Sequence, residues 1–438
     1  YRLSEMDFEA NSKDGHGVDW PVRYKDIAPW YDYVEEYIGV SGQNEGLDQL
    51  PDGKFLKPME LNCVEEHLKK TLDENFDNCK LTIGRTAHLT ERHNERGPCQ
   101  YRNMCETGCP FSGYFSSVSV TLPAAQKTGN MTFKPHAIVH SIIYDEKQGK
   151  ATGVKVINAE TKETTEYFAR VIFLCASTLP STQIMLNSKS DSFPEGIGNS
   201  SGTLGRHLMD HFSINSRAVI NGFEDGYYNG HRPNGIYIPR FQNLKEKEED
   251  YYRGFGYQGS ASRVGWELGN YIEGLGGDFK DRLRKPGPWV LSIGGYGECL
   301  PYHDNRVELH PELKDEWGMP LLHISCELKE NEKKIMKAMK ERGSEILEKA
   351  GGIDIQHSEP EDYIFGDGIH EMGTARMGKD PKTSVLNKWN ACHDVPNLFV
   401  TDGSFMTSSG CQNPSLTYMA FTARAANYAV EQMKKGTL

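Results

Sequence analysis

The sequence has 438 residues, of which 61 are acidic and 49 are basic, so its net charge is −12. This acidic balance disfavours a nucleic-acid partner, because few cations remain to neutralise phosphates. The apolar content of 37% is typical of globular proteins and excludes collagen-like and disordered classes. No apolar run approaches the roughly 20 residues that would span a bilayer, so we expect no membrane-spanning segment.

The length predicts more than one domain, and the residue pattern divides the chain into four parts. Residues 1–115 hold an aromatic helix and a cysteine-rich loop. Residues 116–205 and 366–438 have the strand–turn–helix pattern of a nucleotide-binding domain, and residues 206–365 form a separate domain between them. The predicted fold class is therefore α/β, with a Rossmann-like domain and a second, α+β domain.

The first part begins irregularly and becomes helical. Apolar residues recur at helical spacing after Pro29 and predict a helix over 30–38 that ends at Gly39. We interpret its aromatic face as a packing surface. A second helix is predicted over 63–72, followed by a strand over 80–83.

The second part is rich in strands. The apolar run RVIFLCA (170–176) predicts a strand that is buried on both faces. Ala176 and Ser177 then lead into a helix. Because a helix N-terminus attracts phosphate groups, these two residues are candidates for contact with a nucleotide cofactor.

The third part, 206–365, has short β-like pieces that are broken by glycines and charged loops: RAVING, GIYIPRF, WVLSIGGYG, NRVELH and PLLHISCEL. A helix is predicted over 330–352 and ends at two glycines. This pattern indicates an antiparallel sheet with helices on one side.

The last part has the densest motif content. An apolar strand, NLFV, runs into Asp402, Gly403 and Ser404. A long helix follows, for which we predict Asn413 as the N-cap residue and Pro414 as the first helical residue.

Several of these motifs together resemble the glucose–methanol–choline (GMC) flavoprotein oxidoreductases. The matching segments are HEMGTARMG, NLFVTDGS and NPSLT in the last part, and DWPVRYKDIAPWY and LGRHLMDHF before it. They occur in the family's order and extend over nearly the whole chain. The resemblance implies an FAD-binding domain, an α+β substrate domain and oxidation of a CH–OH group.

One expected unit is not found at the start of the sequence. The family opens with a strand–GxGxxG–helix unit that binds the FAD pyrophosphate, and no such unit precedes the aromatic helix. We expect the natural protein to be longer, with this unit ahead of Tyr1. The alternative is a copy of the fold that does not bind FAD.

The resemblance also assigns roles to two residues. His370 matches the catalytic base, and an imidazole suits that role because its pKa lies near neutral pH. Asn413 matches the partner that hydrogen-bonds the same substrate oxygen. Taken alone, His370 would be read as a buried structural histidine, but the surrounding motif favours catalysis.

The cofactor contacts implied by the resemblance lie in the two nucleotide-binding parts. The N-terminal end of the last helix would face the flavin edge where negative charge gathers on reduction. The predicted FAD-contacting residues are Val139 (adenine), Ala176, Ser177, Asp402, Gly403, Ser404, Asn413, Pro414 and Thr417.

Three of the ten cysteines, Cys99, Cys105 and Cys109, lie within eleven residues. Three thiols so close together cannot all form disulfides with one another. Zinc would need a fourth ligand, for which His93 is near in sequence, and iron–sulfur clusters also use closely spaced cysteines. Spacing alone leaves both possibilities open.

The resemblance favours iron and sulfur. The flavoprotein subunits of bacterial sugar dehydrogenases have a similar three-cysteine motif that holds a [3Fe–4S] cluster. It implies a sugar or glycoside dehydrogenase that passes electrons to a cytochrome or quinone, with a small helper subunit, a c-type cytochrome and a periplasmic location.

Two alternatives remain. A pyranose-type oxidase would use oxygen and hold no iron, and a non-enzymatic fragment would be stabilised by a metal.

His207 and His211 are four residues apart, but no glutamate follows the first as in a zinc protease, and we predict that both pack in the core.

Overall fold

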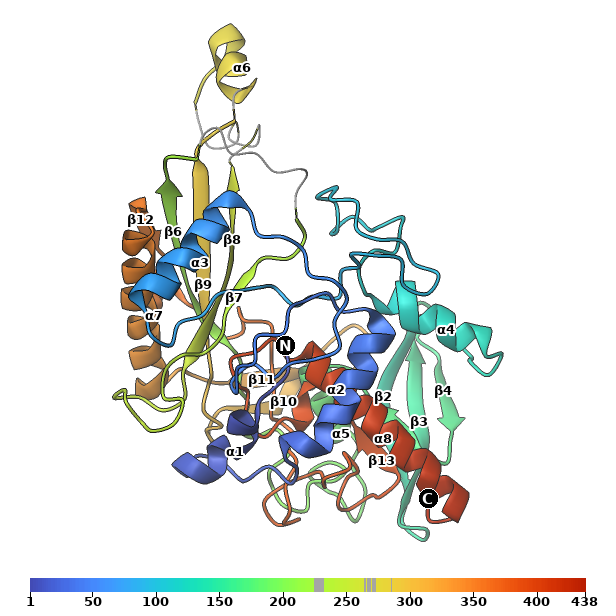
Figure 1. The fold of residues 1–438 in the computed structure, drawn as a ribbon. Coiled ribbons are helices and arrows are strands. Elements are labelled where there is room, and N and C mark those ends of the chain that lie inside the picture. Colours follow the sequence, from blue (N-terminus) through green and yellow to red (C-terminus); the bar gives the residue numbers. More distant parts are fainter. Residues whose placement is uncertain (224–231, 264, 266–268, 270–272, 285) are drawn as a thin grey trace.

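The computed structural model describes all residues except 224–231, 264, 266–268, 270–272 and 285, which fall within the predicted 206–365 domain. The described chain is divided between a large sheet with its covering helices and a second region that contains the C-terminal helix, and the N-terminus lies between the two (Figure 1). Within the part that the structure describes, no helix has the length and apolar character needed to cross a membrane.

The large sheet has six strands in the order β1-β7-β8-β9-β6-β12, and all neighbouring strands are antiparallel. This confirms the predicted α+β domain and adds a short strand from the first part of the chain. The strands are β1 (Thr82–Ile83), β6 (Phe212–Ile220), β7 (Ile236–Ile238), β8 (Phe255–Arg263), β9 (Trp289–Gly297) and β12 (Ile353–His357).

Helix α7 (Glu330–Lys349) covers one face of this sheet, against β6, β9 and β12 (Figure 1). Its buried residues recur every three or four positions, and β6 alternates between buried and exposed residues, as a packed helix and sheet require. A Cβ atom at Gly343 would lie 2.7 Å from the Ser216 hydroxyl, so this glycine allows the helix to approach the sheet closely. Helix α3 (Cys63–Asn75) contacts β8 and α7.

The sequence does contain a GxGxxG pattern, at residues 254–259. The structure shows that it is not a phosphate-binding loop. Most of it lies within β8, which pairs with β7 on one side and β9 on the other. The glycines serve close strand packing instead, since a Cβ atom at Gly259 would lie 2.0 Å from the Ser292 carbonyl oxygen.

The second region contains two small sheets and a hairpin. Strand β5 (Ile172–Leu174) pairs in parallel with β13 (Leu398–Val400) and leads into α5 (Thr178–Asn187). The prediction that this strand is buried on both faces is wrong, because Phe173 is 36% exposed. The remaining strands are β2 (Ala137–Asp145), β3 (Lys150–Asn158) and β4 (Thr164–Phe168), which form an antiparallel sheet, and the hairpin of β10 (Arg306–Lys314) and β11 (Pro320–Ser325).

Helices from opposite ends of the sequence pack side by side in this region. Helix α2 (Tyr24–Ile38) contacts α8 (Ser415–Lys435), as Figure 1 shows. Helix α2 begins before Pro29, and Pro414, not Asn413, is the N-cap of α8; both predicted starts are corrected by these bounds. The other helices are α1 (Glu5–Asp14), α4 (Leu122–Lys127), α6 (Gly276–Arg284), η1 (Ser117–Thr121), η3 (Pro360–Asp362) and η4 (Gly403–Phe405).

Candidate active site

His370 lies in an irregular segment just before a short backbone pairing. The amide of Met372 donates to the carbonyl of Met209 at 2.9 Å, and the reverse bond has the same length. This pairing brings residues 207–211 against residues 370–372. It places His370 beside His211, which is separated from it by 159 residues in sequence.

The two imidazoles are in direct contact. The Nδ1 atoms of His370 and His211 are 2.9 Å apart, and their rings are nearly perpendicular, at 82°. The Nε2 atom of His211 is 2.9 Å from the carbonyl oxygen of Gly410. Burial lowers the pKa of His370, and burial together with His370 lowers the pKa of His211 to about 3.

Asp210 holds the backbone of both histidines. Its Oδ1 atom accepts the amide hydrogen of His211 at 2.7 Å and that of His370 at 2.8 Å. The carboxyl is 1% exposed, and burial raises its pKa to about 7. The hydroxyl of Tyr363 donates to the His211 carbonyl at 2.6 Å, so the histidine pair is fixed from several directions.

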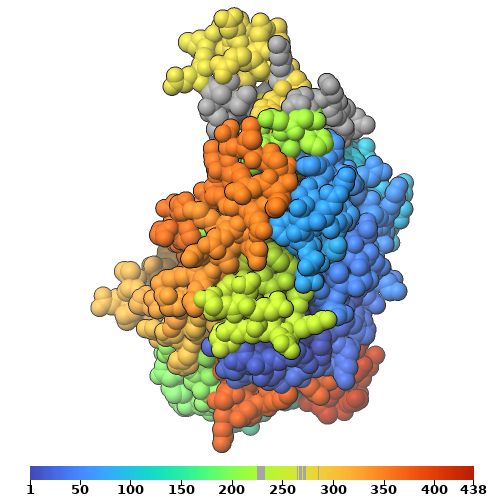
Figure 2. All heavy atoms as spheres, turned by 60° about the vertical axis from the view of Figure 1, so that its left-hand side comes forward, coloured from blue at the N-terminus to red at the C-terminus, as the bar shows by residue number. Residues whose placement is uncertain are grey.

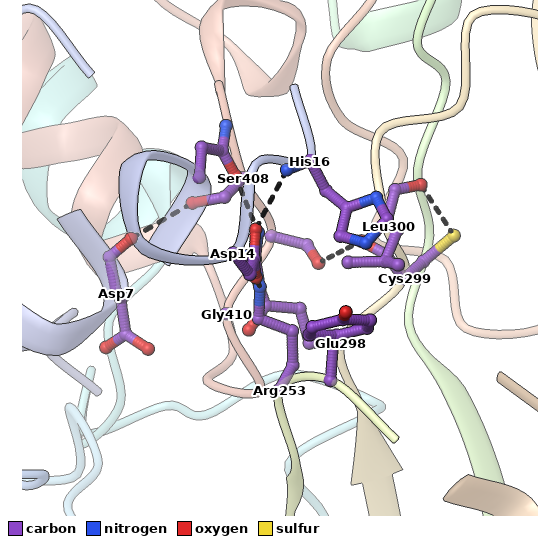
Figure 3. Close-up of polar contacts among 12 residues, drawn as sticks. Asp7, Asp14, His16, Arg253, Glu298, Cys299, Leu300, Ser408 and Gly410 are labelled. Carbon is purple, nitrogen blue, oxygen red and sulfur yellow. Dashed lines mark hydrogen bonds and ion pairs between the residues drawn. The ribbon is translucent and has the colours of Figure 1, made fainter. Parts of the chain in front are cut away.

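The segment that contains Gly410 is attached to the first helix. The hydroxyl of Ser408 donates to the carbonyl of Asp7 at 3.2 Å (Figure 3) and accepts from the Trp20 indole at 2.7 Å. Ser409 donates to the Cys299 carbonyl at 3.2 Å. The position of Gly410, and with it the orientation of His211, therefore depends on α1.

A buried ion-pair cluster lies behind this segment (Figure 3). Arg253 pairs with Asp14 and Glu298 and donates to the side-chain oxygen of Asn11 at 2.8 Å. Burial raises the pKa of Glu298, although Arg253 opposes that shift. In Figure 2 the dark-blue N-terminal segment lies between a yellow-green segment and the orange-red C-terminal part, and Asp14 at the end of α1 pairs with Arg253.

Several predicted cofactor residues meet at the start of α5. The carboxylate of Asp402 accepts bonds from the hydroxyls of Ser181 and Ser404, and burial raises its pKa. Ala176 and Ser177 are exposed at the same end of the helix, and Ser177 has a φ of 76°. The structure thus brings the strand–turn–helix motif and the 402–404 turn together.

The other predicted cofactor residues lie elsewhere. Val139 is on β2, next to His140, whose carbonyl accepts from Asn187 at the opposite end of α5. Thr417 is fully buried, and its hydroxyl is 2.8 Å from the hydroxyl of Tyr31 on α2. Asn413 is half-buried and Pro414 is buried at the start of α8. Contact of these residues with FAD or substrate stays a prediction.

The three clustered cysteines lie on one hairpin-like loop. The amide of Leu89 donates to the carbonyl of Gly113 at 2.7 Å, and the amide of Cys99 donates to the carbonyl of Leu89 at 2.8 Å. Cys99, Cys105 and Cys109 line one cavity of about 40 Å³. Burial raises the pKa of Cys105, and the other two thiols add to that shift.

Backbone amides donate to two of the three sulfur atoms. The amide of Tyr101 is 3.4 Å from the Cys99 sulfur, and that of Gly113 is 3.3 Å from the Cys109 sulfur. His93 does not line this cavity; its ring lies against Gly39 and faces a different cavity. Among the described residues, no three His, Cys, Asp or Glu side chains are grouped closely enough to hold a metal ion.

A larger cavity connects the base of the cysteine loop with the C-terminal helix. It has a volume of about 210 Å³. His88 and Tyr114, which form the bridge at the base of the loop, line one side. Ser415 and Leu416, from the first turn of α8, line another. The base of the cysteine loop and the start of α8 therefore line the same cavity, whereas the three cysteines line a different one together with Pro233.

The sequence interpretation missed the importance of His211. We predicted core packing for it, and it is 1% exposed, but it also contacts the side chain of His370. The four-residue spacing from His207 was misleading, because residues 207–211 are not helical and the two imidazoles bond to different partners. The useful signal was the Asp-His pair directly before a strand.

Comparison with protein families gives two matches. Residues 13–213 match the N-terminal GMC oxidoreductase model, and residues 301–422 match the C-terminal GMC oxidoreductase model. Together they include most of the chain and all of the predicted catalytic and metal-binding residues.

Similar curated proteins include dehydrogenases and oxidases. The 2-methyl-1,2-propanediol dehydrogenase of Mycolicibacterium austroafricanum is 28% identical, over 98% of this chain and 78% of its own length. The fructose dehydrogenase large subunit of Gluconobacter japonicus is 27% identical, over 100% and 79%. Paromamine 6'-oxidase of Streptomyces fradiae is also 27% identical, over 97% and 75%.

Solved structures agree on the fold. Pyridoxine 4-oxidase from Mesorbium loti superposes with a TM-score of 0.58 at 14% identity, over 98% of this chain and 81% of that chain. An FAD-dependent oxidoreductase from Chaetomium thermophilum gives a TM-score of 0.57 at 11% identity, over 99% and 84%.

Proposed function

Because the chain belongs to the GMC oxidoreductase family, whose members oxidise CH–OH groups with FAD, we propose that it is a dehydrogenase of a sugar or glycoside hydroxyl. The relatives' names support this substrate class, since they include fructose, gluconate, paromamine and pyranose. A small diol is the other chemistry among them.

The observation that carries the proposal is the placement of the cysteine loop. Its base and the first turn of α8 line the same cavity, and the three thiols lie farther along the same loop, so the loop offers a path for electrons from a cofactor held at the helix start. An oxidase that passes electrons to oxygen would not need this loop.

The chain's residues fit an FAD molecule in two places. The exposed backbone of Ala176 and Ser177 at the start of α5 suits a phosphate group, and the start of α8 suits the flavin edge that becomes negative. FAD, when bound, would accept a hydride, that is two electrons and one proton, from the substrate carbon. His370 takes the hydroxyl proton, and Asn413 orients the substrate oxygen.

We propose a [3Fe–4S] cluster on the three cysteines in preference to a Cys₃His zinc site, and binding it would require the three thiols to lie closer together than they do in this structure. They line one cavity, and two of them accept backbone N–H bonds, a known way to adjust the potential of such clusters. The fourth zinc ligand considered, His93, faces another cavity. The cluster would pass single electrons to a cytochrome or quinone.

We propose a multisubunit complex for the whole protein. One relative is named a large subunit, which supports a helper subunit beside this chain. A c-type cytochrome as acceptor and a periplasmic location complete the proposal, and fractionation of the native organism with heme staining of copurifying proteins tests both.

The decisive experiment uses the full-length protein, purified without added metal. Its visible spectrum, its low-temperature EPR spectrum and its iron and zinc contents are recorded before and after dithionite reduction. Flavin with about three irons per chain is the expected result. Flavin without iron would replace the dehydrogenase by a pyranose-type oxidase, and zinc without flavin would end the enzyme assignment.

A further inference from the structure

The tautomer of His211 follows from its contact with Gly410. Its Nε2 atom is 2.9 Å from the Gly410 carbonyl oxygen. A carbonyl oxygen can only accept a hydrogen bond, so Nε2 of His211 carries a hydrogen and donates it.

The other ring nitrogen of His211 carries no hydrogen. The side chain is buried, and its pKa falls to about 3 because burial and the neighbouring His370 disfavour a second proton. Since the single hydrogen of the neutral ring is on Nε2, Nδ1 presents a lone pair and acts as an acceptor.

The tautomer of His370 is then determined. Its Nδ1 atom is 2.9 Å from that lone pair, a hydrogen-bond distance, so Nδ1 of His370 is the donor. A neutral imidazole has one N–H, which leaves Nε2 of His370 with a free lone pair. His370 is half-buried, and its Nε2 is the nitrogen that the pair leaves for a substrate.

The acceptor cannot easily move away. Gly410 has a φ of 63°, and a Cβ atom there would lie 2.5 Å from the Gln412 side chain and 2.8 Å from Leu3. Its carbonyl direction is therefore fixed by backbone that only glycine adopts readily. The Tyr363 and Asp210 bonds hold the backbone of His211 on the opposite side.

We infer that His211 is a positioning residue that holds His370 in the tautomer whose Nε2 atom accepts the substrate's hydroxyl proton. This inference rests on the proposed function. In the step, the substrate O–H bond breaks, its electron pair stays on oxygen, and an N–H bond forms at Nε2. The positive charge that His370 gains strengthens its Nδ1–H bond to His211, since charge-assisted hydrogen bonds are the stronger ones.

The direct test is ¹⁵N NMR of the full-length, FAD-loaded protein with labelled histidine, in which protonated and lone-pair nitrogens have separate chemical shifts. His370 is assigned by the signals that disappear in His370→Gln. We expect a protonated Nδ1 on His370 and a scalar coupling across the N–H···N bond to His211. A protonated Nε2 and a bare Nδ1 on His370 would overturn the inference, whatever the activity.

Kinetics on three variants separates positioning from packing. His211→Phe keeps the ring but removes the acceptor, and we expect flavin reduction by substrate to slow roughly 10- to 100-fold with KM within about twofold. His211→Asn offers an amide oxygen at the Nδ1 position and should restore most of the rate. His211→Gln can still donate to the Gly410 carbonyl, but it offers no acceptor at the Nδ1 position that faces His370. It should therefore behave like His211→Phe.

The controls distinguish this inference from the proposed function. FAD content and thermal midpoint are measured for each variant, so a misfolded variant is recognised and the others decide. A wild-type reduction rate in His211→Phe would overturn the inference. A wild-type rate in His370→Gln would instead overturn the assignment of the base, and the NMR result for the tautomer would still stand.

Discussion

The Oδ1 atom of Asp210 accepts the amide hydrogen of His370 at 2.8 Å, while its Oδ2 atom is buried without a hydrogen-bond partner among the described residues. Oδ1 therefore satisfies a backbone amide, whereas the buried Oδ2 has no donor, within the described chain, that would stabilise its negative charge. Burial raises its folded-state pKa to about 7, from 3.8. This relationship gives a pH-dependent prediction.

We expect Asp210→Asn to stabilise the protein at pH 8 but much less at pH 4. Between these values the unfolded chain has lost the Asp210 proton while the folded chain retains it. Stability therefore falls as the pH rises through this window, by up to about 4 kcal/mol since one pKa unit is about 1.4 kcal/mol. Denaturant unfolding of both proteins at pH 4 and pH 8 measures the difference, and an equal gain at both values would contradict the prediction.

Substitution of the proposed base should separate cofactor binding from chemistry. His370→Gln should retain the visible flavin spectrum but reduce the rate of flavin reduction by substrate at least about 100-fold, because general-base catalysis contributes that much or more. Stopped-flow absorbance under anaerobic conditions measures the rate. The control is His323→Gln on β11, an exposed histidine outside the site, which should leave the rate unchanged.

The cysteine loop should be needed for electron exit only. Cys105→Ser should remove most of the iron, leave flavin reduction by substrate close to wild type, and abolish electron transfer to a cytochrome or artificial one-electron acceptor. Iron assay and anaerobic kinetics on the same sample test this. The matched control is Cys326→Ser, because Cys326 lies outside the cysteine loop. Full acceptor turnover in Cys105→Ser would eliminate the relay.

The cluster around Arg253 should dominate stability near α1. Arg253→Met leaves Glu298 and Asp14 without their cation in a buried site, and loss of one partner of a buried pair costs about 3–5 kcal/mol. Arg284→Met breaks an exposed pair with Asp281 and should cost less than about 1 kcal/mol. Urea unfolding compares the two variants, and equal losses would show that the buried cluster is not specially important.

The residue before the base has an unfavourable backbone conformation. Ile369 is β-branched with a φ of 50°, and its side chain is 77% exposed, so little packing compensates the strain. We expect Ile369→Asn to raise the free energy of unfolding by roughly 1 kcal/mol, since asparagine tolerates this conformation. Thermal unfolding measures the gain, and an unchanged midpoint would show that the strain is relieved elsewhere.

The sequence predicted those elements whose buried residues recur at regular spacing. Strand β9 and helix α7 bury regularly spaced residues, so both were found within a few positions. Strand β8 was missed because glycines and polar residues such as Ser260 and Ser262 give it little strand propensity, and it is extended because β7 and β9 pair with it from both sides.

The candidate site was predictable only in part. Motif resemblance pointed to His370 and the cysteines, but no local pattern could show that His211 meets His370 or that Gly410, 199 residues beyond His211, fixes its ring. The apolar run 170–176 was overinterpreted, because hydrophobic composition does not show how many neighbours a strand has. Whether residues so far apart in sequence meet depends on the topology of the fold. The periodicity of apolar residues carries no information about that topology.

The bond between Asp7 and Ser408 joins residues 401 positions apart. During synthesis at about 5–20 residues per second, α1 would therefore leave the ribosome roughly 20 to 80 s before the segment that it supports. Until then α1 can contact α2 and Arg253, but its surface that faces Ser408 has no partner, and contacts of such high order form slowly. Docking of this segment belongs to the last stage of folding, and activity should emerge only after the whole chain has been released.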